Sequence, residues 1–216
     1  MLAEPNTNSS KSNVTRESGR GLMLDDTHLW QNIRKDNELA FSILYKKYVQ
    51  RLYSYGMHYC HKHDLVTDCL QELFTSIWTK RSSLSVVHSV SAYLFKSFRR
   101  LLIKKITWSK RFLLALEPSH ERFFEVSLPI EQVIENHERE VEWNARINHS
   151  LKGLSKRQRE AIFLRFYNDL SYAEIASVME MQVDSVYNTI SKAIESLRQQ
   201  LKNAVPLLWT AYLLIF

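Results

Sequence analysis

The sequence predicts an all-α protein of two small helical domains joined by a flexible linker, the C-terminal domain being a helix-turn-helix. Only 4 glycines and 4 prolines occur among 216 residues, too few for the tight turns of β-sandwiches or for Gly-rich phosphate loops. Apolar residues recur instead at spacings of three and four, the period of amphipathic helices. A separate cluster of acidic residues lies between two such helical stretches. These observations together indicate two domains.

Residues 1–21 are rich in Ser, Asn and Thr and almost lack apolar side chains, so we expect a disordered leader. The same residues lack the apolar core of a secretory signal peptide. The two cysteines, Cys60 and Cys69, are too few for a disulfide framework. We therefore expect a cytoplasmic protein.

The first domain is expected over residues 22–111. Apolar and aromatic residues line one helical face from 39 to 59 and again from 65 to 77. Asp64 stands where a side chain could cap the second of these helices. A third helix is expected from about residue 91 to 106, which completes a three-helix domain.

Basic side chains dominate the end of this domain. The chain as a whole has a net charge of +6, which favours a polyanionic partner. Residues 80–111 contain nine basic side chains and no acidic one. We interpret this segment as a surface that binds nucleic acid.

An acidic linker is expected over residues 112–140, where seven acidic and two basic side chains accompany the helix breakers Pro118 and Pro129. The following domain is expected over residues 141–203. An apolar tail, 204–216, then ends the sequence. At about 1.5 Å per residue in a helix, 13 residues are too short to cross a bilayer.

Helix-turn-helix signals are clear in the second domain. Ser155 and Gln158 have the spacing of a capping box, which predicts a helix start. A short helix over 171–179 and a longer one over 184–201 follow, separated by only a few residues. Their apolar faces match, as in a helix-turn-helix whose second helix enters the major groove.

Several of these segments resemble bacterial RNA polymerase sigma factors. The run Asp68-Cys-Leu-Gln-Glu-Leu-Phe74, followed by Trp78, resembles the helix that binds core polymerase. Residues 91–100 resemble the adjoining helix that handles the promoter minus-ten element, and 154–198 resemble the domain that reads the minus-35 element. This order and separation are similar to the extracytoplasmic-function (ECF) type of the sigma-70 family, over about residues 22–202.

The resemblance implies a protein that binds core enzyme, recognises promoters, helps melt the DNA and initiates transcription, without catalysing a reaction or needing a cofactor. We expect an anti-sigma factor to regulate it. The expected core-polymerase contacts are Asp68, Gln71 and Glu72. The expected minus-ten DNA contacts are Lys96, Arg99, Arg100, Lys104 and Lys105. The expected minus-35 DNA contacts are Arg157, Arg165, Ser171, Tyr172, Ser185, Tyr187, Asn188, Thr189, Ser191 and Lys192.

In the family, the loop between Arg81 and Ser91 captures an extruded base. Tyr93 and Phe98 are aromatic rings near it, but their helical spacing favours a place in the core. Trp108 is a further candidate for stacking on a base.

The sequence departs from the family pattern at two places. Tyr187 stands where relatives usually carry a basic residue, and Thr189 where another is frequent, so we expect a shallower salt dependence of DNA binding. Glu180 occupies the place in the turn that glycine commonly holds. We expect a left-handed backbone there, at the cost that a Cβ imposes.

Other interpretations remain open at this point. His58, Cys60, His61 and His63 could suggest zinc, although structural zinc normally uses two separated ligand pairs. A stand-alone regulator would share the helix-turn-helix but lack the first domain, and an RNA-binding adaptor would bind without initiating transcription. The apolar tail could pack on the protein's own helices or on an anti-sigma factor, or anchor the chain to a membrane surface.

Overall fold

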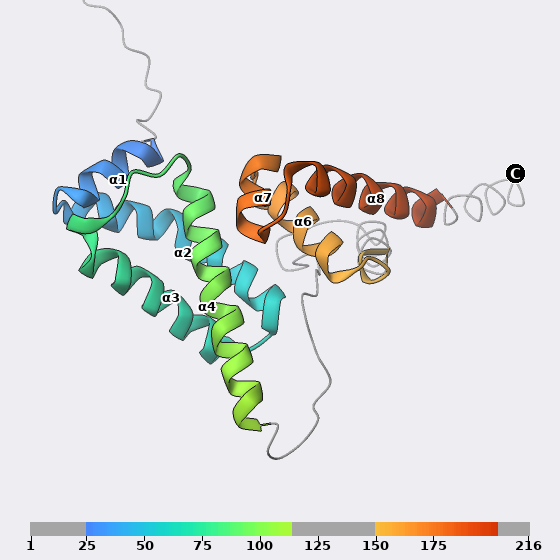
Figure 1. The fold of residues 1–216 in the computed structure, drawn as a ribbon, viewed down its shortest axis with the longest axis horizontal. Helices are drawn as coiled ribbons and strands as arrows, with labels where there is room; N and C mark the ends of the chain where they lie inside the picture. The colour runs from blue at the N-terminus through green and yellow to red at the C-terminus, as the bar shows by residue number, and fades with distance from the viewer. Residues whose placement is uncertain (1–24, 114–149, 203–216) are drawn as a thin grey trace, which may run out of the picture.

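The computed structural model describes residues 25–113 and 150–202, and every regular element in these ranges is a helix (Figure 1). The all-α fold class is thus confirmed for the part of the chain that is described. The predicted leader and apolar tail lie outside the described residues, as does most of the predicted acidic linker. The domain boundaries therefore stay predictions.

The N-terminal group of helices surrounds one apolar core. It contains four α-helices and a short 3₁₀ turn within residues 25–113. The first α-helix was not expected from the sequence, and the helix expected from about residue 91 is longer than predicted. The elements are α1 (Asp26–Arg34), α2 (Glu38–Cys60), α3 (His63–Thr79), η1 (Arg81–Ser83) and α4 (Val90–Leu113).

The helix starts in this group are set by different means. Asn37 caps α2 by accepting a hydrogen bond from the amide of Ala40 at 2.9 Å. The prediction that Asp64 caps α3 is wrong, because the helix begins one residue earlier, at His63, after Lys62. A lysine side chain cannot accept a bond from the free amides. Asp64 instead lies in the first turn, where its negative charge interacts favourably with the positive end of the helix dipole.

Gly56 marks the tightest helix contact of this core. A Cβ at this position would lie 2.8 Å from Cγ1 of Val66 and 3.1 Å from the ring of Phe98. Phe98 is fully buried, which confirms that it belongs to the core. Helices α2, α3 and α4 therefore meet at a position where only hydrogen fits.

We expect Gly56→Ala to destabilise the protein. Overpacking costs about 1–3 kcal/mol, which exceeds the gain of up to about 1 kcal/mol in helix propensity. Urea unfolding followed by circular dichroism measures the change. Gly153→Ala is the matched control, because its Cβ would meet only the flexible side chain of Gln200. Equal stability of the two variants would show that Val66 and Phe98 can yield.

The C-terminal group is the helix-turn-helix, formed by α6 (Lys156–Phe166), α7 (Tyr172–Met179) and α8 (Val183–Lys202). The predicted capping box of Ser155 and Gln158 is confirmed. A second capping box, formed by Ser171 and Glu174, starts α7. The short helix is thus fixed at its N-terminus by two reciprocal hydrogen bonds.

The turn after α7 confirms the expectation for Glu180. This residue has a φ of 56° and a ψ of 50°, the left-handed conformation, and its amide closes the helix on the carbonyl of Ala176. Glycine adopts this conformation without strain, whereas a residue with a Cβ pays about 1–2 kcal/mol.

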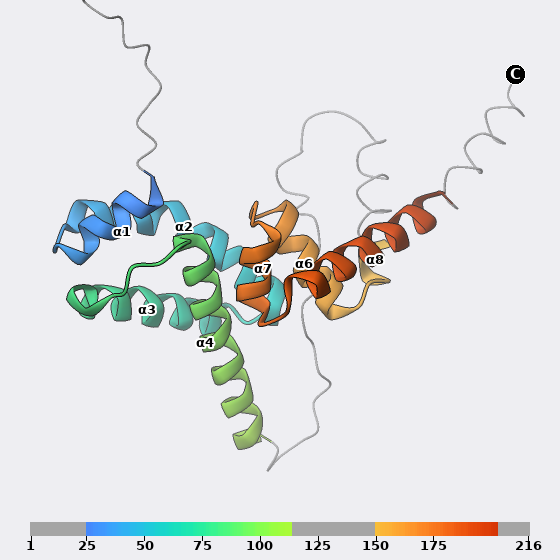
Figure 2. The same ribbon diagram turned by 45° about the horizontal axis from the view of Figure 1, so that its top comes forward.

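The two groups of helices pack against each other. Helix α7 lies against α4, and α8 lies on the far side of α7, as two views of the molecule show (Figures 1 and 2). Aromatic rings from α2 and α6 meet in the same contact, with Tyr55 and Phe163 centroids 6.2 Å apart. Within residues 25–113 and 150–202, no helix is long and apolar enough to cross a membrane.

Candidate protein and nucleic-acid interfaces

The expected polymerase contacts lie on the solvent face of α3. Asp68, Gln71 and Glu72 are all exposed, whereas Cys69 and Leu70 on the opposite face are buried in the core. The helix is therefore a rigid support that presents three polar groups outward. Their role in binding polymerase stays a prediction.

A groove of about 640 Å³ lies between α2 and α3, next to these residues. Sequence periodicity did not reveal it, because it predicts which face of each helix is apolar but not where two faces leave a gap. Gln71 lines the groove and so joins it to the exposed face of α3. Five of the eleven residues that line the groove are aromatic, namely Phe41, Tyr45, Tyr53, Phe74 and Trp78.

Four of the five expected minus-ten cations on α4 are in contact with other side chains of this protein. The Lys96 ammonium lies 3.4 Å from the Ser177 hydroxyl, and Lys105 forms an ion pair of 3.1 Å with Glu72. Arg99 and Arg100 form ion pairs with carboxylates of the helix-turn-helix. Lys104 is exposed.

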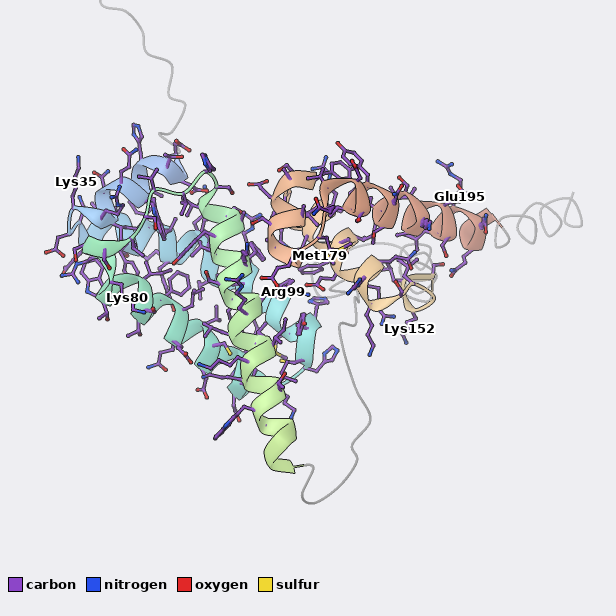
Figure 3. The ribbon with its side chains drawn as sticks, in the orientation of Figure 1. Lys35, Lys80, Arg99, Lys152, Met179 and Glu195 are labelled. Atoms are coloured by element: carbon purple, nitrogen blue, oxygen red, sulfur yellow. The ribbon has the colours of Figure 1, made fainter. Side chains whose placement is uncertain are left out.

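Arg99 lies at the centre of the contact between the two groups of helices, and Figure 3 shows it on the side of α4 that faces α6 and α7. Its Nε donates to Oε1 of Glu160 at 2.7 Å, and the Tyr55 hydroxyl donates to the same oxygen at 2.6 Å. Glu160 is only 5% exposed. The carboxylate is thus buried but has two donors, as a buried charge requires.

Burial and charge both change the acidity of this cluster. Burial is the largest single influence and lowers the pKa of Arg99, but the charge of Glu160, the hydrogen bond to it and the neighbouring tyrosines together raise the pKa more, so the net shift is upward. Burial raises the pKa of Tyr55 well above its usual value, and the charge of Glu160 raises it further. Arg99 therefore stays charged and Tyr55 stays neutral, which keeps both as donors to the carboxylate.

Most of the residues expected to contact the minus-35 element from α8 are exposed. Ser185, Asn188 and Lys192 follow one another at spacings of three and four, and Tyr187 and Ser191 are also exposed. Thr189 is different, because its hydroxyl donates to the carbonyl of Ser185 at 2.7 Å. The exposed residues of α8 therefore form one continuous polar strip, which consists of Ser185, Tyr187, Asn188, Ser191 and Lys192.

Helix α6 and the start of α7 carry the other expected minus-35 contacts. Tyr172 stacks on Tyr187 with centroids 3.9 Å apart, and the Arg165 guanidinium lies 5.2 Å above the Tyr172 ring. The Ser171 hydroxyl caps α7, and Arg157 on α6 is exposed. Tyr187 thus fills the place of the missing cation with a ring that is held by a second ring.

The segment between η1 and α4 is held by α1. The indole Nε1 of Trp30 donates to the Ser85 carbonyl at 3.0 Å, and its ring meets Tyr93 edge to face at 5.0 Å. Tyr93 is therefore partly buried against the core, as its spacing predicted, and it packs there on α1, which was not expected. Trp108 is 73% exposed on α4. Its role stays a prediction.

No three His, Cys, Asp or Glu side chains converge as a metal site in the described part of the chain. In the segment that could suggest zinc, Cys60 is buried and its thiol faces the Gly56 carbonyl at 3.5 Å. His58 Nδ1 lies 2.7 Å from the Ser54 carbonyl. In the described part of the chain, the side chains that could suggest zinc are therefore not a set of converging ligands.

Comparison with known families identifies both groups of helices. The model of Sigma-70 region 2 matches residues 44–112, and that of Sigma-70, region 4 matches residues 145–197. The chain belongs to the sigma-70 family. The matches comprise region 2 and region 4 and no other region of the family, and this is the architecture of an ECF sigma factor. A search of curated proteins finds no match.

Two solved structures share this fold. The sigma factor RpoE of Bartonella quintana, crystallised with the anti-sigma factor NepR, is 21% identical, with a TM-score of 0.57, 75% of this chain covered and 96% of that one. CnrH, in complex with the cytosolic domain of CnrY, is 20% identical, with a TM-score of 0.54, 82% of this chain covered and 97% of that one.

Membership settles the general activity. Sigma factors are non-catalytic subunits of RNA polymerase, and this one binds the polymerase and promoter DNA and directs transcription initiation. Region 4 is the DNA-binding helix-turn-helix. The match to region 2 also excludes the stand-alone regulator, which would lack the first domain.

Proposed function

We propose that this sigma factor divides its work among three helices. The exposed face of α3 binds the polymerase core through Asp68, Gln71 and Glu72. The cations of α4 hold the minus-ten strand. The polar strip of α8 reads the minus-35 element from the major groove, and Arg165 and Tyr172 hold the neighbouring phosphates.

The observation that carries this proposal is the polar strip of α8. Its residues are exposed while the opposite face, with Val186, Ile190 and Ala193, is buried. A helix fixed in this way can enter a major groove with its polar side outward. Asn188 has the amide that pairs with adenine, and Lys192 has a cation for guanine or phosphate.

We expect Asn188→Ala and Lys192→Ala to have different effects on promoter binding by the holoenzyme. Loss of the amide should cost about 1–3 kcal/mol and remove the preference at one base pair. Loss of the cation should weaken binding to all sequences and reduce the salt slope by about one. Run-off transcription from a genomic fragment library gives the preferences, and fluorescence anisotropy at several salt concentrations gives the slope.

Gln199→Ala is the matched control for both variants. Gln199 is exposed near the other end of α8, and its amide nitrogen contacts Glu195 on the same helix at 3.1 Å. This variant should transcribe like the wild type. If Asn188→Ala and Lys192→Ala also kept the wild-type preferences and salt slope, α8 would not be the reading helix.

We also propose that an anti-sigma factor regulates this protein. The support is that both solved structures described above contain an anti-sigma factor or, for CnrH, the cytosolic domain of CnrY. Affinity purification of the full chain, followed by inhibition of run-off transcription with the captured protein, tests it. Capture without inhibition would contradict the proposal.

A further inference from the structure

The polar strip of α8 contains one aromatic side chain, that of Tyr187. This residue is 49% exposed. It directly precedes Asn188, whose amide is proposed above to pair with adenine. The reading helix therefore presents a large ring next to a group that contacts a base.

A second tyrosine holds this ring in place. Helices α7 and α8 lie side by side (Figures 1 and 2), and Tyr172 at the start of α7 stacks on Tyr187. The ring planes are 10° apart and the centroids are 3.9 Å apart. Tyr172 is itself partly buried against the core. The Tyr187 ring is thus supported before DNA arrives, which reduces the entropy that it loses on binding.

Arg165 joins the two stacked tyrosines to the segment that precedes α7. Its guanidinium lies 5.2 Å from the centre of the Tyr172 ring, and its Nη1 donates to the Leu170 carbonyl at 3.0 Å. The Leu170 amide in turn donates to the carbonyl of Leu164 in α6 at 3.1 Å. Three helices therefore help to position the exposed part of Tyr187.

The chemistry of this exposed ring suits one feature of the major groove. Base edges there present hydrogen-bond donors and acceptors, together with the apolar C5-methyl group of thymine. An aromatic ring can bury this methyl group by direct contact, but it offers no cation to guanine or to a phosphate. Tyr172 covers one face of the Tyr187 ring, and the exposed half of the side chain is left for such a contact.

From this geometry we infer that Tyr187 reads the methyl group of a thymine that neighbours the base pair contacted by Asn188. Tyr172 is a positioning residue that holds the ring. The inference rests on the major-groove role proposed above for α8. A phosphate contact of Tyr172 uses its hydroxyl, so the ring face stays available to support Tyr187. The preferred minus-35 element therefore contains a thymine at a fixed place.

The test removes only the methyl group from the DNA. The probe is a labelled duplex with the sequence of the most active fragment recovered by run-off transcription from the genomic library. Each thymine upstream of the minus-ten element is replaced in turn by deoxyuridine, which pairs like thymine and lacks only the methyl group. Gel-shift titrations with the holoenzyme give the ratio of the affinities for the thymine and deoxyuridine duplexes.

For the wild type, deoxyuridine in place of one thymine should weaken binding roughly fourfold, the effect of one methyl group that is no longer buried. Tyr187→Ala should bind the two duplexes equally, whereas Tyr187→Phe keeps the ring and should keep the fourfold ratio. Gln199→Ala, at an exposed position near the other end of α8, should match the wild type. Deoxyuridine can also alter the duplex itself, so the comparison of the wild type with Tyr187→Ala on the same duplexes decides the result.

Three results would overturn the inference. One is that no replacement of a thymine weakens binding by the wild type. Another is a fourfold ratio that persists in Tyr187→Ala. The third is the loss of this ratio in Tyr187→Phe, which would show that the hydroxyl rather than the ring makes the contact.

Two variants of Tyr172 separate positioning from phosphate binding. Tyr172→Leu and Tyr172→Phe both lose the hydroxyl, so both should bind the thymine duplex more weakly than the wild type. Phenylalanine keeps a ring for stacking and should keep the fourfold ratio, whereas leucine should bring the ratio close to one. A fourfold ratio in Tyr172→Leu would overturn the positioning role. Tyr172→Met gives the same reading if circular dichroism shows that Tyr172→Leu does not fold.

Failure of the proposed function would be visible separately. If α8 did not enter the major groove, Asn188→Ala and Lys192→Ala would keep the wild-type preferences and salt slope, and no deoxyuridine would affect binding through Tyr187. If those two variants behave as proposed while wild-type binding is insensitive to deoxyuridine, only the inference about Tyr187 fails.

Discussion

Asp68→Ala/Gln71→Ala/Glu72→Ala is expected to abolish most promoter-specific transcription while leaving the fold intact. All three side chains are exposed on α3, so their truncation removes no core packing. Truncation of an interface side chain costs more than about 1 kcal/mol of binding free energy only when the side chain lies near the centre of the interface. If the three truncations together cost about 3 kcal/mol, the affinity for core enzyme falls roughly hundredfold.

The measurement is competition for purified core enzyme, followed by run-off transcription at a limiting concentration of the sigma factor. The matched control is Asp25→Ala/Gln31→Ala/Glu38→Ala, which removes the same residue types at exposed positions that lie on α1 and α2 or next to them, away from α3. Excess of the triple variant should restore transcription, because its DNA-reading helices are unchanged. Wild-type affinity in the triple variant would rule out this face of α3.

Trp30→Ala is expected to be the most destabilising single substitution considered. The side chain is 2% exposed, packs on Tyr93 and donates to the Ser85 carbonyl. Removal of a buried tryptophan costs about 3–5 kcal/mol, and the Ser85 carbonyl loses its partner as well. Urea unfolding followed by circular dichroism gives the change in the free energy of unfolding.

Trp30→Phe separates packing from hydrogen bonding. Phenylalanine keeps an aromatic ring but lacks the N–H group, so we expect a smaller loss in the free energy of unfolding. About 1 kcal/mol of that loss comes from the missing hydrogen bond. If both variants lost the same stability, the bond to Ser85 rather than the ring would hold α1 to this segment. The segment matters because the resemblance to sigma factors predicts that it captures an extruded base.

Local signals in the sequence predicted much of this fold. The spacing of apolar residues predicted α2, α3 and α4, and the pair Ser155 and Gln158 predicted the start of α6. The αL backbone of Glu180 was also expected, because the family commonly places glycine there. These features depend on residues that are neighbours along the chain or on one helix face, so a single sequence contains the necessary information.

Features that depend on distant partners could not be predicted. Glu160 follows four polar residues and precedes four apolar ones, and its partners Arg99 and Tyr55 are 61 and 105 positions away. Helix α1 has only nine residues, too few for a convincing period. The cap of α3 was assigned wrongly because Asp64 has the chemistry of a cap, yet the helix starts before it.

The ion pair of Lys105 and Glu72 has a consequence for the order of assembly. It joins a residue assigned to promoter DNA with one assigned to the enzyme, and neither can serve both at once. If the enzyme binds Glu72 as proposed, the Lys105 ammonium is released and can bind a phosphate. Loading onto the enzyme would thereby precede and assist engagement of the template, in a single exchange of partners.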